Sequence, residues 1–123
     1  MQIVYGLENL TRPETPVALA IGNFDGVHRG HQSILRRVVE LANTHRLTPV
    51  VMTFEFHPLK VLAPQSAPAL LMPLARRQQI MAQLGIKLVV VARCVHSFLQ
   101  MDRGQFVRDV LMKCFDVKYI VEG

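Results

Sequence analysis

Residues 17–45 read VALAIGNFDGVHRGHQSILRRVVELANTH, and this stretch decides the fold. It opens with Val17–Asn23, a short apolar run that ends in Gly22–Asn23 and is typical of a strand buried on both faces. A glycine-containing segment follows, and from Gly30 to His45 the apolar residues recur at helical spacing. The apolar stripe consists of Ile34, Leu35, Val38, Val39, Leu41 and Ala42, whereas Arg36, Arg37 and Glu40 face away. The stretch therefore predicts a strand, a loop and a helix in direct succession.

The rest of the chain repeats this alternation. Three more runs predict strands: Thr48–Phe54, Lys87–Ala92 and Lys118–Val121. Strands that alternate with helices predict a parallel sheet with right-handed crossovers. The fold class is therefore α/β, with four strands expected in one sheet.

Two further helices are expected between these strands. Leu74–Leu84 carries a helical pattern, and Gly85 is placed to cap its C-terminus. Arg103–Phe115 carries another, and Asp102 is placed to cap its N-terminus. Pro58–Pro73 contains four prolines and reads as a long loop, a feature that is often functional in a compact domain.

Composition excludes several classes of protein. The chain has 123 residues, of which 50% are hydrophobic and 19% charged, and this suits one globular domain. No apolar run reaches the length of a membrane-spanning helix, and the N-terminus lacks the features of a secretory signal. The two cysteines, Cys94 and Cys114, are too few for a disulfide framework and are expected to be free thiols. We therefore expect a cytoplasmic protein with no membrane partner.

The formal net charge is +5, which raises the question of a nucleic-acid partner. The arginines, however, occur in scattered pairs, Arg36–Arg37 and Arg76–Arg77, and no nucleic-acid-binding signature accompanies them. We interpret these pairs as solvated helix faces and expect no nucleic-acid partner. A weak attraction for phosphorylated small molecules is the second interpretation.

The segment between the first strand and its helix carries the main functional signal. Ligands of open α/β sheets bind beyond the carboxyl ends of the strands. Glycines at 22, 26 and 30 permit close backbone approach there, and the following helix N-terminus favours an anion. His28 and His31 are spaced to share one face of the helix start. Two such donors can stabilise the charge that develops on a reacting phosphate.

Other interpretations of the histidine pair remain open. A zinc site needs a third ligand, for which His57 is the only plausible candidate, and chance spacing is the third possibility. A second segment, Thr53–Pro58, follows the second strand on the same predicted edge. Its two phenylalanines form either one wall of an aromatic ligand pocket or a surface that packs on a helix. The segment by itself does not decide between the two.

These segments resemble a known family. Gly22–Gln32, GNFDGVHRGHQ, resembles the His-x-Gly-His motif of nucleotidyltransferases in its flavin-specific form. That form belongs to the FMN adenylyltransferase module of bacterial FAD synthetases, the bifunctional riboflavin kinase/FMN adenylyltransferases. Thr53–Pro58 resembles the second family signature, Thr-Phe-x-Pro-His-Pro, with Phe56 where the family usually has proline. The resemblance covers essentially the whole chain, including the order of elements after Leu71.

The resemblance implies a Rossmann-like nucleotidyltransferase fold and the reaction of FMN with ATP, assisted by Mg²⁺, to give FAD and pyrophosphate. It implies that His28 and His31 contact the ATP phosphates and stabilise the transition state. Residues implied to shape the ATP site are Gly22, Asn23, Phe24, Asp25 and Gly30. Residues implied to lie along FMN are Thr53, Phe54, His57 and Pro58. The resemblance assigns no metal ligand on the chain.

The family continues beyond Gly123 with an Asp/Asn-Phe-x-Phe-Gly segment and a later Ile-Ser-Ser segment that ends in arginine. We therefore expect residues 1–123 to form part of the nucleotidyltransferase domain, truncated before the last strand, without the riboflavin kinase domain. One alternative is another His-x-Gly-His transferase, acting on pantetheine phosphate, nicotinamide mononucleotide or glycerol phosphate. The other is a non-catalytic nucleotide-binding module.

Overall fold

A computed structural model describes residues 1–22, 24, 29–54, 74–92 and 100–122. Within them the chain forms a five-stranded sheet in the order β1-β4-β3-β2-β5. All neighbouring strands are parallel. The strands are β1 (Gln2–Tyr5), β2 (Val17–Ile21), β3 (Thr48–Phe54), β4 (Leu88–Ala92) and β5 (Val117–Glu122). The predicted α/β class with a parallel sheet is confirmed.

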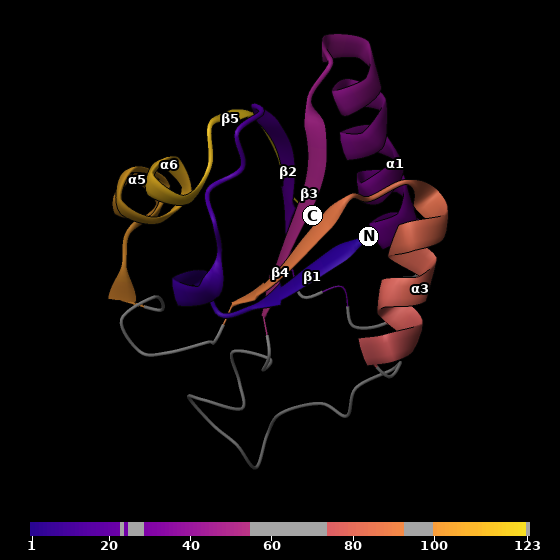
Figure 1. The fold of residues 1–123 in the computed structure, drawn as a ribbon, viewed down its shortest axis with the longest axis horizontal. Helices are drawn as coiled ribbons and strands as arrows, with labels where there is room; N and C mark the ends of the chain where they lie inside the picture. The colour runs from indigo at the N-terminus through magenta and orange to yellow at the C-terminus, as the bar shows by residue number, and fades with distance from the viewer. Residues whose placement is uncertain (23, 25–28, 55–73, 93–99, 123) are drawn as a thin grey trace.

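Helices cover both faces of this sheet. Figure 1 shows α1 (Arg29–His45) and α3 (Leu74–Leu84) on one side and α5 (Arg103–Phe106) and α6 (Met112–Cys114) on the other. A short 3-10 helix, η1 (Leu7–Asn9), follows β1, and a π-helical turn, η3 (Val107–Leu111), joins α5 to α6. The sheet is thus the middle layer of three.

The number of strands differs from the four that the sequence pattern predicts. The additional strand is β1, which pairs with β4 in the register Gln2↔Leu88 to Tyr5↔Val91. Four residues are too few to show a clear hydrophobic period, and β1 lies at the edge of the sheet, where its side chains are only partly buried. Its strand conformation depends on pairing with β4, a partner more than eighty residues away in the sequence.

Two hydrophobic clusters lie on opposite faces of the sheet, because successive residues of a strand point to opposite sides. We call the cluster beneath α1 and α3 the α1–α3 cluster; its buried members are Ala18, Ala20, Phe24, Leu35, Val38, Ala42, Val51, Met81, Ile86, Val89 and Val91. We call the other the η3 cluster; its buried members are Val17, Leu19, Val50, Met52, Leu88, Val90, Ala92, Val110, Leu111 and Phe115. The predicted apolar stripe of α1 packs in the first of these.

The predicted helix caps are confirmed. Gly85 has a φ of 106°, and the N–H groups of Gly85 and Ile86 donate to the carbonyls of Ala82 (3.1 Å) and Met81 (3.1 Å). These two hydrogen bonds form a Schellman motif, which ends α3. The carboxylate of Asp102 accepts a 2.7 Å hydrogen bond from the N–H of Gln105, as an N-cap residue does.

The predicted helix from 103 to 115 is correct in position but not in regularity. Val107–Leu111 forms a π-helical turn, so the helix consists of α5, η3 and α6 in succession. A π turn inserts one residue into an α-helical repeat. Val110, Leu111 and Phe115 are nevertheless buried in the η3 cluster, as the predicted apolar stripe requires.

Candidate functional site

The carboxyl ends of all five strands lie at one edge of the sheet, because every neighbouring pair is parallel. We call this the carboxyl edge. Here Ile21 of β2 lies beside Met52 of β3 and Glu122 of β5. The chain passes from β2 to β3 through α1, whereas the connection from β4 to β5 crosses on the other face. Between β2 and β5 the winding therefore reverses, and ligands of open α/β sheets bind at such a point.

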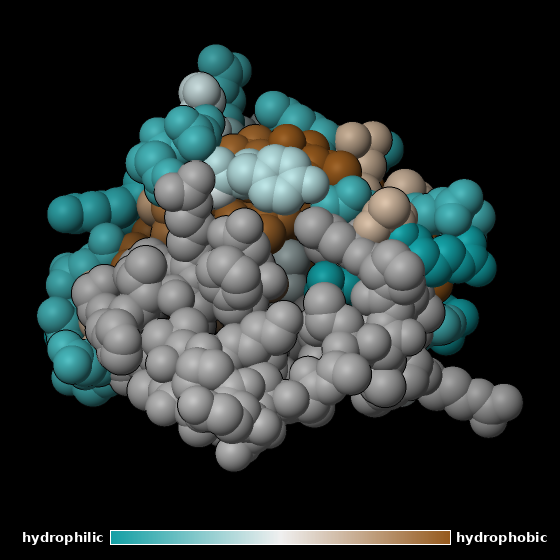
Figure 2. All heavy atoms as spheres, turned by 90° about the horizontal axis from the view of Figure 1, so that it is seen from below, coloured by the Kyte–Doolittle hydropathy of each residue, from teal (hydrophilic) through white to brown (hydrophobic). Residues whose placement is uncertain are grey.

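Figure 2 views the molecule from below in the frame of Figure 1, toward the carboxyl edge. Hydrophobic side chains gather in the upper half of this view, with hydrophilic side chains on either side of them. Figure 1 shows that β2, β3 and β4 all end toward this side. A ligand at this edge would meet the ends of several strands together with the N-terminus of α1.

The N-terminus of α1 suits a negatively charged ligand. Its first turn contains no acidic residue, although Asp and Glu are the residues that the helix dipole favours there. Gly30 is exposed, and His31 is partly buried one residue further along the helix. The unpaired N–H groups at a helix start and the positive end of the dipole both favour an anion. The phosphate site at this helix start stays a prediction.

Phe24 organises the connection between β2 and α1. Its side chain is 1% exposed and belongs to the α1–α3 cluster, and its backbone has a φ of 54°, a conformation that non-glycine residues rarely adopt. Its ring meets the His31 ring edge-on, with centroids 5.3 Å apart and planes at 70°. The imidazole of His31 is therefore oriented by a ring that is itself held in the core.

Gly22 permits this placement of Phe24. A Cβ atom on Gly22 would lie 3.2 Å from the Phe24 ring, closer than ordinary van der Waals contact. The N–H of Gly22 donates to the carbonyl of Met52 at 3.2 Å, which continues the sheet pairing one residue beyond β2. The sequence analysis assigns Gly22 to close approach by a ligand, but the described contact is with Phe24.

Several predicted site residues lie outside the described part of the chain. They are Asn23, Asp25, His28, His57 and Pro58. The convergence of His28 with His31 on one phosphate therefore stays a prediction, as does the role of His57.

Thr53 and Phe54 lie on opposite faces of β3. Thr53 is fully buried and, two residues after Val51, faces the side of α1 and α3. Phe54 is partly buried and packs against the η3 cluster. The described contacts of the Phe54 ring thus favour the packing interpretation, whereas Thr53 lies on the same side of the sheet as His31.

Arg77 is buried within α3. The prediction that both arginines of the Arg76–Arg77 pair are solvated is wrong for Arg77, whose exposed fraction is 3%. Arg76 is exposed and donates a 2.8 Å hydrogen bond to Gln79 on the surface of α3. Helical spacing could have indicated the burial of Arg77, because Arg77 and the buried Met81 are four residues apart and share a face of the helix.

Three further features of the described residues concern metal binding, membrane-spanning helices and the thiol of Cys114. No group of three or more His, Cys, Asp or Glu side chains gathers there in a way that could hold a metal ion. None of the described helices combines the length and apolar character that crossing a membrane requires. Cys114 is a free thiol, and burial raises its pKa, an effect that the nearby charges of Arg12 and Lys113 oppose.

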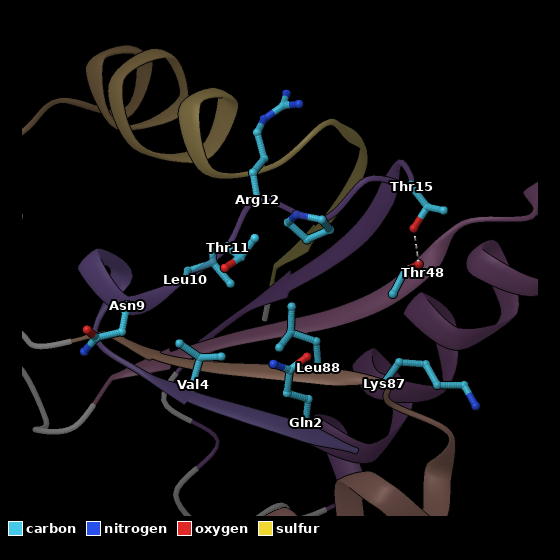
Figure 3. Close-up of a pocket in the computed structure, with 11 residues that line it drawn as sticks. Gln2, Val4, Asn9, Leu10, Thr11, Arg12, Thr15, Thr48, Lys87 and Leu88 are labelled. Atoms are coloured by element: carbon cyan, nitrogen blue, oxygen red, sulfur yellow. Dashed lines mark hydrogen bonds between the residues drawn. The ribbon is translucent and has the colours of Figure 1, made fainter.

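A cavity of about 410 Å³ lies at the opposite edge of the sheet, where the strands begin. We call this the amino edge. The cavity lies between residues 9–15 and the strands β1 and β4, and Figure 3 shows its lining. Arg12 and Lys87 point in different directions in this view, so their charges do not converge on one point. Its volume is in the range of ligand sites, but its charges are not arranged for one anion.

Comparison with known proteins identifies the family of this chain. A family model described as FAD synthetase matches residues 11–123. The chain belongs to the FAD synthetase family. Relatives described as bifunctional riboflavin kinase/FMN adenylyltransferase are 36% identical over 124 residues in Escherichia coli K12 and 38% identical over 124 residues in Pseudomonas fluorescens. All of this chain is covered in both, but only 40% and 39% of the relatives. This FAD synthetase family chain thus spans about two fifths of their length.

A solved structure supports the same fold. A crystal structure described as a macrolide-efflux protein from Streptococcus pneumoniae superposes on this chain with a TM-score of 0.82 and 26% sequence identity. The match covers 99% of this chain and 41% of the other. The three-layer arrangement of the FAD synthetase family chain therefore recurs almost completely within a longer protein.

Proposed function

We propose that this chain carries the FMN adenylyltransferase activity of its family, the transfer of an adenylyl group from ATP to FMN to give FAD and pyrophosphate. The observation that carries the proposal is the link between β2 and α1. The FAD synthetase family model spans this link, and the link orients His31 at a helix start without acidic residues. An enzyme that handles two phosphorylated substrates requires such an anion-favouring site.

The reaction itself is an in-line displacement. A 5′-phosphate oxygen of FMN forms a bond to the α-phosphorus of ATP, and the bond between that phosphorus and the α,β-bridging oxygen breaks. The electron pair leaves with pyrophosphate, and no covalent bond to the protein forms. Because negative charge redistributes over the phosphate oxygens, donors held in place before the reaction lower its barrier.

The described residues would act mainly by positioning the groups that contact the phosphates. The edge-on contact with the Phe24 ring would restrict the orientation of the His31 imidazole before the substrate arrives. Gly30 would let the α-phosphate approach the backbone at the start of α1, and Gly22 would keep room for Phe24. His28 would supply a second donor, and Asn23 and Asp25 would shape the loop over the phosphate.

For the flavin side, Thr53, Phe54, His57 and Pro58 are the proposed residues. The position of Thr53 on the same side of the sheet as His31 supports its assignment. Since Phe54 packs against the η3 cluster, we propose that it serves the flavin side indirectly, by supporting the end of β3 that carries Thr53.

Mg²⁺ would bind with the ATP phosphates and neutralise part of their charge. This ion is usually held by substrate phosphates together with one or two carboxylates. The described residues provide no cluster of three candidate ligands, and we assign none of them to the ion. We further propose that residues 1–123 are part of the nucleotidyltransferase domain and that the protein works in the cytoplasm. The free thiol of Cys114 suits a reducing compartment.

The test is calorimetric titration of ATP and of FMN, separately, followed by an assay for FAD with both substrates and Mg²⁺. We expect both ligands to bind and FAD to form. Pantetheine phosphate serves as the control substrate. Adenylylation of pantetheine phosphate with no reaction of FMN would show a different His-x-Gly-His transferase. Binding of ATP without binding of FMN would favour a non-catalytic nucleotide-binding module.

A further inference from the structure

Positive charge gathers at the amino edge of the sheet. Among the described residues, five exposed cationic side chains lie there: Arg12, Arg46, Lys87, Lys113 and Lys118. They come from the loop before β2, the turn after α1, the turn before β4, α6 and β5. Two described carboxylates, Glu14 and Asp116, lie among them, and Asp116 already pairs with Lys118 at 3.4 Å. The amino edge therefore keeps an excess of positive charge.

The sheet joins these segments into one row. Backbone hydrogen bonds of 2.8 to 3.0 Å connect the starts of β4 and β3, of β3 and β2, and of β2 and β5. Neighbouring strands lie about 4.8 Å apart, so three strand spacings separate Lys87 from Lys118 by roughly 14 Å. Arg12 and Lys113 lie near each other, since the charges of both act on the thiol of Cys114. The cations thus follow an extended line.

Helix C-termini account for only part of this charge. Cations are favoured near the negative end of a helix dipole, and Lys113 lies in the last turn of α6. The last turn of α3, however, contains no basic residue. Arg12, Lys87 and Lys118 lie outside the helices. Because like charges repel, gathering these three at one edge is unfavourable unless negative charge from elsewhere compensates it.

Two hollows with apolar side chains in their lining flank the row. The cavity of about 410 Å³ includes Val4, Leu10 and Leu88, side chains of the η3 side. A second hollow, of about 460 Å³, is lined by Pro16, His45, Leu47, Lys118 and Tyr119. Figure 3 shows Arg12 and Lys87 directed away from each other around the first cavity. Charges that diverge in this way suit a ligand with several separated negative groups better than one small anion.

We propose that the amino edge binds an extended segment of another protein that contains both acidic and apolar side chains. Roughly four to five residues of extended chain span the distance from Lys87 to Lys118. Carboxylates of the segment would pair with the cations of the row, and its apolar side chains would enter the hollows. This inference does not depend on the proposed function, because the carboxyl edge lies at the other end of the strands.

A nucleic acid fits this edge less well. The exposed carboxylate of Glu14 lies in the row and would repel a backbone that carries a negative charge at every nucleotide. The apolar walls of the two hollows would also stay unused by a phosphate backbone. We therefore include a nucleic acid as a competitor in the test.

The experiment measures binding of short fluorescent peptides by anisotropy. One peptide contains glutamate and leucine in equal numbers, a second has glutamine for glutamate, a third has serine for leucine, and oligothymidylate is the nucleic-acid probe. The test variant combines Arg12→Gln with Lys87→Gln. The matched control combines Arg36→Gln with Arg76→Gln, which removes the same charge from exposed positions within α1 and α3. Backbone amide chemical shifts locate the bound peptide.

We expect the glutamate–leucine peptide to bind, and its affinity to fall as salt is raised, because exposed charge pairs are screened. The glutamine and serine peptides should bind on the order of tenfold more weakly. The test variant should lose on the order of fivefold in affinity, the size of two exposed ion pairs. The control variant should change by less than about twofold. Amide shifts should change at Thr48, Lys87 and Lys118.

Four results would overturn the proposal. They are the absence of peptide binding at low salt, equal binding of the glutamine peptide, equal losses in the test and control variants, and shifts confined to the carboxyl edge. Tighter binding of oligothymidylate than of the peptide would also overturn it, by showing a nucleic-acid surface. A chain that binds the peptide but forms no FAD would leave this inference standing and contradict only the proposed function.

Discussion

The carboxyl and amino edges of the sheet differ in how each uses its polar groups. At the amino edge the N–H groups of Gly85 and Ile86 donate to carbonyls of α3, the hydroxyls of Thr15 and Thr48 bond to each other at 2.7 Å, and a cavity of about 410 Å³ remains. At the carboxyl edge Arg77 and Thr53 are buried, and Phe24 adopts a positive φ. The difference teaches that neither a hollow nor a strained backbone distinguishes the two edges, since Arg46 at the amino edge also has a positive φ of 56°. The buried polar side chains at the carboxyl edge do distinguish them, and such groups are typical of functional sites.

The largest expected effect is on stability at the carboxyl edge. Phe24→Ala should lower the free energy of unfolding by about 3–5 kcal/mol, because it leaves a cavity among buried side chains. At the amino edge Leu10→Ala should cost less than about 2 kcal/mol, since Leu10 is partly buried beside an existing cavity. Chemical denaturation measures both. Equal losses would contradict the distinction between the two edges.

The second largest effect is on enzymatic activity, and it compares substitutions of histidines at the two ends of α1. His31→Ala at the carboxyl edge should lower the rate of FAD formation by roughly 10²–10³-fold, the loss expected for one oriented donor. His45→Ala is the control; this histidine stacks on Tyr119 with ring centroids 4.8 Å apart, at the other end of the helix. We expect its kcat to stay near that of the parent. A His31→Ala enzyme as fast as the His45→Ala enzyme would remove His31 from the mechanism.

The third effect distinguishes Gly22 from Gly85 by the ATP affinity of their alanine variants. Gly22→Ala should cost about 1–3 kcal/mol of stability because the new methyl group crowds the Phe24 ring, and it should also weaken ATP binding. Gly85→Ala should cost about 1–2 kcal/mol because of its φ of 106°, with ATP affinity unchanged. Calorimetry with ATP, together with thermal unfolding, distinguishes them. The same loss of ATP affinity in both variants would mean that Gly22 has no special relation to the site.

The smallest effect concerns Cys114 on the η3 side. Because burial raises its pKa, a smaller fraction of the thiol is ionised at a given pH than in a free cysteine. Alkylation in a Cys94→Ser background should therefore be slower than that of a model thiol near neutral pH, and its rate should rise only at higher pH. The pH profile of iodoacetamide labelling measures this. A profile shifted to lower pH than the model thiol would show that the charge of Arg12 outweighs burial.

Much of the fold could be predicted because its signals are local. The stripe of α1, the cap at Gly85 and the central strands each follow from residues that are near one another in sequence. The β1 strand and the burial of Arg77 could not be predicted in this way. Both depend on what packs against them, β4 for the strand and the interior beneath α3 for the arginine.

Some features of the candidate site could likewise be predicted from local sequence, whereas others depend on tertiary packing. The position of the helix start and of His31 at the carboxyl edge could be predicted from the order of elements, because a strand followed by glycine and a helix positions backbone N–H groups at one edge. The roles of the histidines stay predictions. The role of Gly22 toward Phe24 was not, since it depends on how the ring folds back onto the chain. The same holds for Phe54, which the alternation of β3 directs away from Thr53.

The sequence by itself determined the α/β class, the succession of elements and the family signature, because hydrophobic period and motif order are properties of neighbouring residues. Only the tertiary structure decided the strand order, the ring contact between Phe24 and His31, and which of two adjacent arginines is buried. The physical reason is that burial and ring contacts join residues that are distant in the chain. No local pattern of one sequence specifies those neighbours.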